Sequence, residues 1–410
     1  MACARAFRYG GRMMTAPRIP FLVLLLWIAG LCAAGQFAKI AVPFAEFRAL
    51  YPGAGGNVGW LLSVISLLGA LFGAFAGALV GVTGPVRMLV GGLLAGGVIS
   101  LLQSGIPGFS VMLASRVVEG LAHLAIVVAA PTLIARITPD RWRGASMALW
   151  STFFGVAFAL VAWAGLPLVH RAGLGALFAV HGAVMLGVGV VAAVALRGTG
   201  GPEEPEETDG LAAIRAIPGR LVAACRSPFI AAPGASWLFY TVIFVAVMAI
   251  LPERLPDGVR APVTAAMPLL STGMALIGVP LLMRGIGASA IVIGGFACSM
   301  VAVLVFGQVS LAAMCLVLFT TMGLVQGAGF AAVPELNRTG DAQALSYGLM
   351  AQTGNIGNLA GTPLLLAVLD HGGERALYLA IAAIYGAAVV VLVTLARMRR
   401  RSGLQPQAHL

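Results

Sequence analysis

Apolar residues recur in long runs along the chain, and short polar or arginine-containing segments separate these runs. There are twelve runs, at residues 20–42, 57–80, 86–105, 109–135, 145–169, 173–196, 229–251, 262–283, 288–306, 309–333, 345–369 and 376–396. A bilayer core about 30 Å thick requires about 20 apolar residues per helix, so each run predicts a membrane-spanning helix. Strands are not expected, because a membrane barrel would show short segments of alternating polarity.

The composition supports lipid as the solvent of these helices. Hydrophobic residues make up 60% of the chain and charged residues 10%, against about 25% charged residues in an ordinary soluble domain. A water-soluble fold of 410 residues could not bury so much apolar surface. We therefore expect an all-α integral membrane protein.

Arginine is divided unevenly between the two sides of the predicted membrane. If the N-terminus is cytoplasmic, the cytoplasmic segments hold 18 arginines, and the opposite segments hold five, at Arg48, Arg171, Arg254, Arg260 and Arg375. Basic loops favour the cytoplasmic side, so both termini are expected in the cytoplasm of a multi-pass inner-membrane protein. This distribution explains the net charge of +11 without a nucleic-acid partner.

Signals of other protein classes are missing from the sequence. Residues 1–34 resemble a signal peptide, but eleven further apolar runs follow the first, so we expect a retained membrane helix. The five cysteines are scattered and predict neither a disulfide framework nor a metal site. No HExxH motif, Ser/His pairing or phosphate loop is present, so we expect neither an enzyme nor a cofactor.

The longest interruption divides the chain into two halves. It begins RGTGGPEEPEETDG, which is polar, acidic and rich in Pro and Gly, as is typical of a linker. The predicted parts are an N-terminal six-helix bundle (1–196), a cytoplasmic linker (197–227), a C-terminal six-helix bundle (228–396) and a basic cytoplasmic tail (397–410). VVEGLAH (117–123) resembles LVQGAGF (324–330), which is expected of two-half transporters or arises by chance among Gly-rich and Ala-rich helices.

Three ionisable residues interrupt the fourth run. Arg116, Glu119 and His123 lie at positions i, i+3 and i+7, so they share one face of a helix. A charge at mid-bilayer costs about 2.5–3.5 kcal/mol, so this face should point into the bundle or toward water. One interpretation is a proton-coupling site formed by Arg116, Glu119 and His123, with Glu119 as the proton acceptor beside Arg116. The other is a buried ion pair that fixes helix packing, with His123 as a polar neighbour.

Further polar residues are candidates for substrate binding. Lys39, in the outer third of the first run, either lines a cavity or extends to the outer headgroups; with Arg116 it would suit an anionic or chelating substrate. Amide side chains in later runs either bind substrate or join helices, and Tyr240 either stacks on a ligand or belongs to the core. These later candidates are Gln326, Gln352, Asn355 and Tyr240, whereas His181 is expected to be an isolated packing residue.

Three motifs resemble the major facilitator superfamily of transporters. GALVGVTGPVR (77–87) is similar to the family's loop after the second span, although Gly81 and Val82 stand where the family has Asp-Arg. RVVEG (116–120) resembles its fourth-span signature, and PDRWRG (139–144) resembles its basic turn after that span. The Gly-Pro signature of many drug/proton antiporters is absent from the fifth run. The resemblance implies gating roles for Gly77, Gly84, Arg87 and Arg143.

The resemblance also implies a fold and a function. The fold would be twelve helices in two pseudo-symmetric six-helix bundles, with the first, fourth, seventh and tenth spans around a central cavity. We expect a monomeric secondary transporter whose partners are a small-molecule substrate, protons and the lipid bilayer. The favoured function is proton-coupled export of a small polar or amphiphilic metabolite, drug-like or siderophore-like. The alternatives are proton-coupled uptake of an organic anion and, less favoured, a transporter-like sensor.

Overall fold

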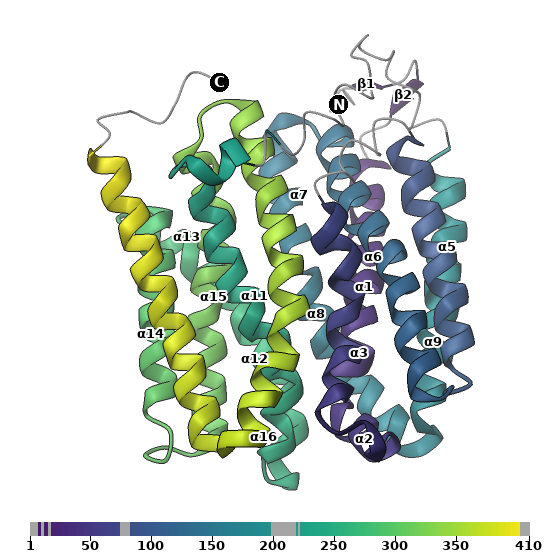
Figure 1. Ribbon diagram of the computed structural model, residues 1–410. Helices are drawn as coiled ribbons and strands as arrows, with labels where there is room; N and C mark the ends of the chain where they lie inside the picture. The colour runs from purple at the N-terminus through teal and green to yellow at the C-terminus, as the bar shows by residue number, and fades with distance from the viewer. Residues whose placement is uncertain are drawn as a thin grey trace.

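The structure is a computed structural model that describes residues 7–9, 12–14, 18–73, 83–197, 219 and 222–401. Most of the predicted linker (197–227) and of the basic tail lies outside these residues. Two short strands, β1 (Phe7–Tyr9) and β2 (Arg12–Met14), pair antiparallel before the first helix. The rest of the described chain is mainly helical (Figure 1), which confirms the predicted all-α membrane fold.

The first half of the described chain contains eleven helical segments with complete bounds, and residues 67–73 are helical as well. They are α1 (Arg18–Ala41), α2 (Phe44–Leu50), η1 (Pro52–Gly59), α3 (Trp60–Ser63), η2 (Val64–Ser66), α5 (Pro85–Gln103), α6 (Phe109–Ile137), α7 (Asp140–Ser151), α8 (Phe153–Leu160), η3 (Val161–Gly165) and α9 (Leu166–Ala195). The segments η1 and η2 are 3₁₀-helical, and η3 is a π-helical stretch between α8 and α9.

The second half contains eight helical segments with complete bounds in the described residues, and residues 222–226 are helical as well. They are α11 (Ala231–Ile250), η4 (Pro252–Arg254), α12 (Asp257–Gly273), η5 (Met274–Gly278), α13 (Val279–Leu282), α14 (Ala288–Leu304), α15 (Leu311–Leu336) and α16 (Gly340–Arg401). The segment η4 is 3₁₀-helical, and η5 is a π-helical stretch inside the span that begins with α12.

Nine stretches of the described residues are long and apolar enough to cross a membrane, and α14 is apolar but shorter. Two of the nine, with 43 and 57 residues, would extend about 65 and 85 Å if straight, more than twice a bilayer core. Each contains a glycine at positive φ, Gly173 (82°) and Gly373 (71°), a conformation that other residues rarely adopt. Figure 1 shows the chain reversing direction within α16. The count of twelve spans stays a prediction.

The helices pack mainly with others from the same half. Helix α1 contacts α6, α8 and α9, whereas α11 contacts α15 and α16, and α14 contacts the same two helices. The two groups meet where α8 packs on α12 and where α3 packs on α16. Figure 1 shows them side by side, with the start of α1 and the end of α16 at the same end of the molecule.

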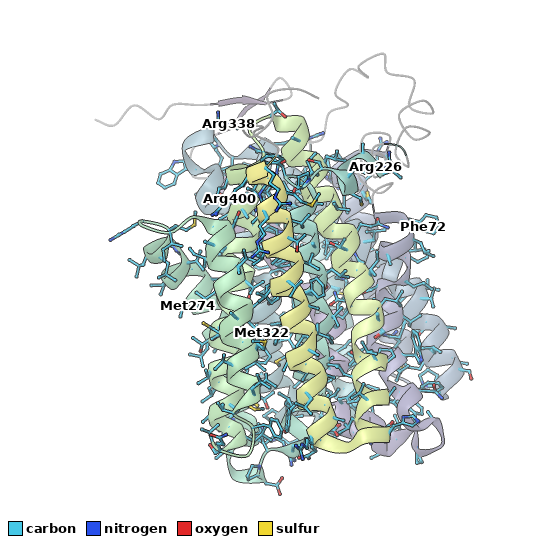
Figure 2. The ribbon with its side chains drawn as sticks, turned by 60° about the vertical axis from the view of Figure 1, so that its left-hand side comes forward. Phe72, Arg226, Met274, Met322, Arg338 and Arg400 are labelled. Atoms are coloured by element: carbon cyan, nitrogen blue, oxygen red, sulfur yellow. The ribbon has the colours of Figure 1, made fainter. Side chains whose placement is uncertain are left out.

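Basic residues gather at that end. Figure 2 shows Arg226, Arg338 and Arg400, three of the arginines predicted to be cytoplasmic, near the same end of the bundle. Arg48 lies on α2 at the opposite end, where Figure 1 places that helix. These four arginines lie at the two ends that the sequence predicts for them, and which end faces the cytoplasm stays a prediction.

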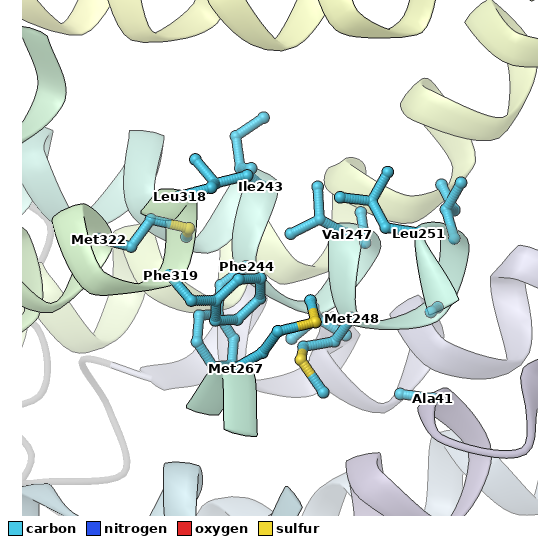
Figure 3. Packing of buried hydrophobic residues seen from close by; sticks show 14 of the residues in the cluster. Ala41, Ile243, Phe244, Val247, Met248, Leu251, Met267, Leu318, Phe319 and Met322 are labelled. Carbon is cyan, nitrogen blue, oxygen red and sulfur yellow. The ribbon is translucent and has the colours of Figure 1, made fainter. Parts of the chain in front are cut away.

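A large apolar core joins the two groups of helices. Phe244 and Met248 of α11 pack with Met267 of α12 and Phe319 of α15 (Figure 3). From the other group, the Phe158 ring of α8 lies with its centroid 5.9 Å from that of Phe244. Lipid tails are as apolar as these side chains, so close van der Waals packing stabilises this contact.

Candidate functional site

The ions of α6 meet a lysine from α1. Glu119 lies between two cations, with Arg116 Nη1 2.5 Å from its Oε2 and Lys39 Nζ 2.7 Å from its Oε1. All three side chains are fully buried. Arg116 and Glu119 are one turn apart on α6, so the local helix makes their pair, whereas packing of α1 against α6 makes the pair with Lys39. We call these three residues the ion triad.

Two side chains of α5 add further hydrogen bonds to the triad. Gln103 Nε2 donates to Glu119 Oε2 (2.9 Å), and Gln103 Oε1 accepts from Lys39 Nζ (2.9 Å). Ser100 Oγ accepts a second bond from Lys39 Nζ (3.0 Å). The sequence analysis missed both residues. The available signal was two polar side chains one turn apart inside an apolar run.

The triad carries one positive charge in excess, because it holds two cations and one carboxylate. Arg116 Nε donates to the carbonyl oxygen of Leu61 (2.9 Å), but Arg116 Nη2 has no hydrogen-bond partner in the described part of the chain. A buried charge without a partner is costly. Such a site favours either a bound anion or the loss of one proton.

Lys39 does not take one of the two positions that the sequence left open, the outer headgroups. Its side chain is fully buried and its ammonium lies 4.5 Å from the centre of the Phe178 ring, so it does not extend to the headgroups. The triad contacts side chains and backbone from α1, α3, α5, α6 and α9. In this conformation the charged face of α6 therefore points into the N-terminal helices, and not onto an open central passage as expected.

Of the two intramembrane histidines, His123 agrees with the polar-neighbour alternative, whereas His181 differs from the expectation. His123 shares the face of Glu119, but its Nδ1 lies 3.2 Å from both Ala33 O and Gln36 Oε1, so its hydrogen bonds go to α1. His181, expected to be isolated, has its Nδ1 3.1 Å from Ser100 Oγ. His181 is thus connected to the triad through Ser100.

Gln326 and Tyr240 lie in the second half. Gln326 Oε1 accepts hydrogen bonds from the hydroxyls of Tyr240 (3.2 Å) and Ser271 (2.9 Å), and its Nε2 donates to Ser151 O on α7 (3.3 Å). Gln326 therefore joins α11, α12 and α15 to a helix of the other half. The Tyr240 ring stacks on Trp237, with centroids 4.9 Å apart, in the apolar core.

The amides of α16 pack against the second membrane span. Gln352 Nε2 donates to Ala70 O. Asn355 Nδ2 donates to Ala351 O of its own helix (2.9 Å), and its side chain lies directly against Gly69. In this conformation the Gln352 side chain joins α16 to that span and Asn355 packs against it, and a role of either amide in substrate binding stays a prediction.

The candidate gating residues are only partly described. Gly84 has a φ of 80° and precedes α5, and Arg87 is exposed on the first turn of that helix. Gly77 and the side chain of Arg143 lie outside the described residues. Within those residues, no group of three or more His, Cys, Asp or Glu side chains is placed to hold a metal ion.

Comparison with known proteins identifies the family. The sequence profile of the Major Facilitator Superfamily matches residues 26–342, from α1 to the start of α16, and includes the whole triad. No curated protein sequence matches the chain. The match extends over well more than half of the 410 residues and agrees with the helical membrane fold. The chain therefore belongs to the Major Facilitator Superfamily of membrane transporters.

Proposed function

We propose that the protein is a proton-coupled secondary transporter that exports a small polar or amphiphilic metabolite across the inner membrane. Family membership supports transport through the bilayer. The observation that supports coupling is the ion triad, a carboxylate held between two cations with no exposed surface. Ionisable groups buried in a membrane bundle are functional by default, because they are expensive to keep there.

The triad supplies a physical route from conformation to proton exchange. Lys39 belongs to α1 and Glu119 to α6, so a change in the packing of these helices separates the two charges. Lys39 left alone in a dry interior favours its neutral form, which it reaches by releasing a proton. Glu119 keeps Arg116 beside it but loses one of its two cations, so it binds a proton more readily than in the intact triad. Opening of the site to alternate sides would then tie proton movement to substrate movement.

A second candidate function is proton-coupled uptake of an organic anion. It is favoured by the excess positive charge of the triad and by the unpartnered Nη2 of Arg116. A carboxylate or phosphate bound there would neutralise the site and form charge-assisted hydrogen bonds.

The wider organisation belongs to the same proposal. The protein acts as a monomer of two six-helix bundles, 1–196 and 228–396, joined by a cytoplasmic linker, with both termini in the cytoplasm. Residues 397–410 form a basic tail that binds acidic headgroups, with about 1 kcal/mol for each charge near the surface. Rocking of the two bundles exposes the site to each side in turn.

Transport in vesicles of both orientations tests the function. Polar, amphiphilic and anionic compounds are added to inverted and right-side-out vesicles under an imposed pH gradient, and flux of each compound is measured. We expect gradient-driven flux in the wild type and at least a tenfold loss of gradient dependence in Glu119→Gln, with exchange of compound retained. The matched control is Asp257→Asn, whose carboxylate is exposed.

The direction of driven flux distinguishes export from uptake. Glu119→Gln with full gradient-driven flux would show that the coupling group lies elsewhere. Loss of both exchange and driven flux in a folded variant would assign Glu119 to binding instead of coupling.

A further inference from the structure

Four polar side chains form a continuous chain of hydrogen bonds from α6 to α9. Glu119 Oε1 is 2.7 Å from Lys39 Nζ, Lys39 Nζ is 3.0 Å from Ser100 Oγ, and Ser100 Oγ is 3.1 Å from His181 Nδ1. The first three side chains are fully buried, whereas His181 is partly exposed. The chain therefore leads from the dry centre of the triad toward the surface of the bundle.

The partners of His181 fix where its ring proton lies. His181 Nε2 is 2.9 Å from the carbonyl oxygen of Cys32, which can only accept a hydrogen bond, so Nε2 carries a proton. In the neutral ring, Nδ1 is therefore an acceptor and faces the hydroxyl of Ser100. A Cβ on Gly35 would lie 2.8 Å from His181 Nε2, so only glycine leaves space for the ring at this place on α1.

Ser100 has one hydroxyl proton and two competing acceptors. These are Phe178 O at 2.9 Å and His181 Nδ1 at 3.1 Å, while Lys39 donates to the hydroxyl oxygen. Rotation of the hydroxyl from Phe178 to His181 exchanges one acceptor for the other. In the second orientation, an unbroken line of donor and acceptor pairs connects the Lys39 ammonium to the imidazole.

We propose that Ser100 relays a proton between Lys39 and His181, an inference that rests on the proposed proton coupling. In the relay step, an N–H bond of Lys39 breaks as its proton passes to Ser100 Oγ, and the original Ser100 proton forms a new N–H bond at His181 Nδ1. Lys39 becomes a neutral amine and His181 an imidazolium, so the net charge of the cluster does not change. Arg116 and Gln103 remain as donors to Glu119.

The surrounding charges favour Lys39 as the source of this proton. The titratable and charged groups around His181 are Lys39 and Cys32 on α1 and Arg116, Glu119 and His123 on α6. A proton arriving from elsewhere would add a third cation to the site. A proton arriving from Lys39 removes the cation at the other end of the relay in the same step, so repulsion does not increase.

Nitrogen NMR of histidine-labelled protein in liposomes tests the relay without a substrate. The full-length protein is labelled with ¹⁵N at its five histidines, and the His181 signals are assigned by their loss in His181→Gln. We expect an imidazolium signal of His181 in exchange with the signal of the neutral ring at neutral pH. Lys39→Arg keeps the charge but does not give up a proton, and Ser100→Ala removes the hydroxyl, so both should lose this signal.

Conservative variants separate the relay from a packing role. Ser100→Thr keeps a hydroxyl and should restore the imidazolium signal, whereas His123→Gln should not change it, because His123 bonds to Ala33 and Gln36. The exposed His170 reports in every variant that the protein is intact. Equal protonation of His181 in the wild type, Lys39→Arg and Ser100→Ala would overturn the relay. If the spectra are as expected but the vesicles show no gradient-driven flux, the proposed function is contradicted and the relay is not.

Discussion

Glu119 is a buried carboxylate whose donors come from three helices. It accepts hydrogen bonds from Lys39 of α1, Gln103 of α5 and Arg116 of its own helix. Hydrogen bonds between ionised groups are about twice as strong as neutral ones, which makes the buried carboxylate tolerable. Removal of one partner of a buried ion pair costs about 3–5 kcal/mol. A substitution in the triad is therefore interpretable only beside a conservative variant of the same residue.

Gln326 makes a residue-scale prediction that concerns stability. Gln326→Leu leaves the buried hydroxyls of Tyr240 and Ser271 without their acceptor, at a cost of about 1–3 kcal/mol for each. We expect a lower melting temperature in detergent than for Gln308→Leu, whose side chain is exposed. Tyr240→Phe with Ser271→Ala in the Gln326→Leu background should recover stability, because it removes the unpartnered groups. Equal melting temperatures for the two single variants would assign Gln326 no such role.

At the scale of the element, close helix contacts depend on glycine beside irregular backbone. Gly120 of α6 faces the carbonyl of Ile65 in the 3₁₀ segment η2, and Gly327 of α15 faces Ala275 in the π segment η5. Each glycine follows the polar residue of the repeated VVEG and LVQG motifs. Short irregular stretches inside a helix often occur at functional hinges. These contacts set how deeply the polar residues of α6 and α15 lie in the bundle.

Gly120→Ala tests the contact between α6 and η2. The new Cβ would overlap the Ile65 carbonyl oxygen, and an overpacked contact costs about 1–3 kcal/mol. The control is Gly91→Ala on α5, where nothing lies within 4 Å of the new Cβ and helix propensity improves by up to about 1 kcal/mol. Thermal unfolding should show a lower melting temperature for Gly120→Ala only. If Gly120→Ala were as stable as Gly91→Ala, α6 and η2 would move apart for the new methyl group without a cost in stability.

At the scale of the whole molecule, the two groups of helices meet at several depths. Helix α8 packs on α12 and α3 packs on α16, and at the end that carries α2 an ion pair joins Arg48 to Glu253 of η4 (3.0 Å). The pair is partly exposed, so water and salt weaken it. An ion pair of this strength can favour contact between the two groups of helices at this end without preventing their separation.

Charge exchange at this pair predicts a shift between conformations. Arg48→Glu replaces an attraction with repulsion, and a change of about 1 kcal/mol corresponds to about a fivefold change in population. Distances between spin labels on α2 and η4 should lengthen in Arg48→Glu and return in the double variant Arg48→Glu with Glu253→Arg, and the difference should shrink at high salt. Identical distance distributions in the single and double variants would exclude a latch at this position.

The sequence by itself determined the helices, the membrane environment, the family resemblance and the pairing of Arg116 with Glu119. These features depend on local periodicity and on the cost of placing polar groups in lipid. The periodicity and the polar positions can both be identified from neighbouring residues in the sequence. Which helices lie beside one another depends on small residues and on hydrogen bonds between distant parts of the chain.

Only the tertiary structure decided that Lys39 pairs with Glu119, 80 residues away, and that His181 reaches the triad through Ser100, 81 residues from it. It also decided that the charged face of α6 points toward α1, α5 and α9, and that the amides of α16 serve helix packing in this conformation. Helical periodicity specifies a shared face but not the neighbour that covers it. That neighbour follows from the packing of the whole bundle.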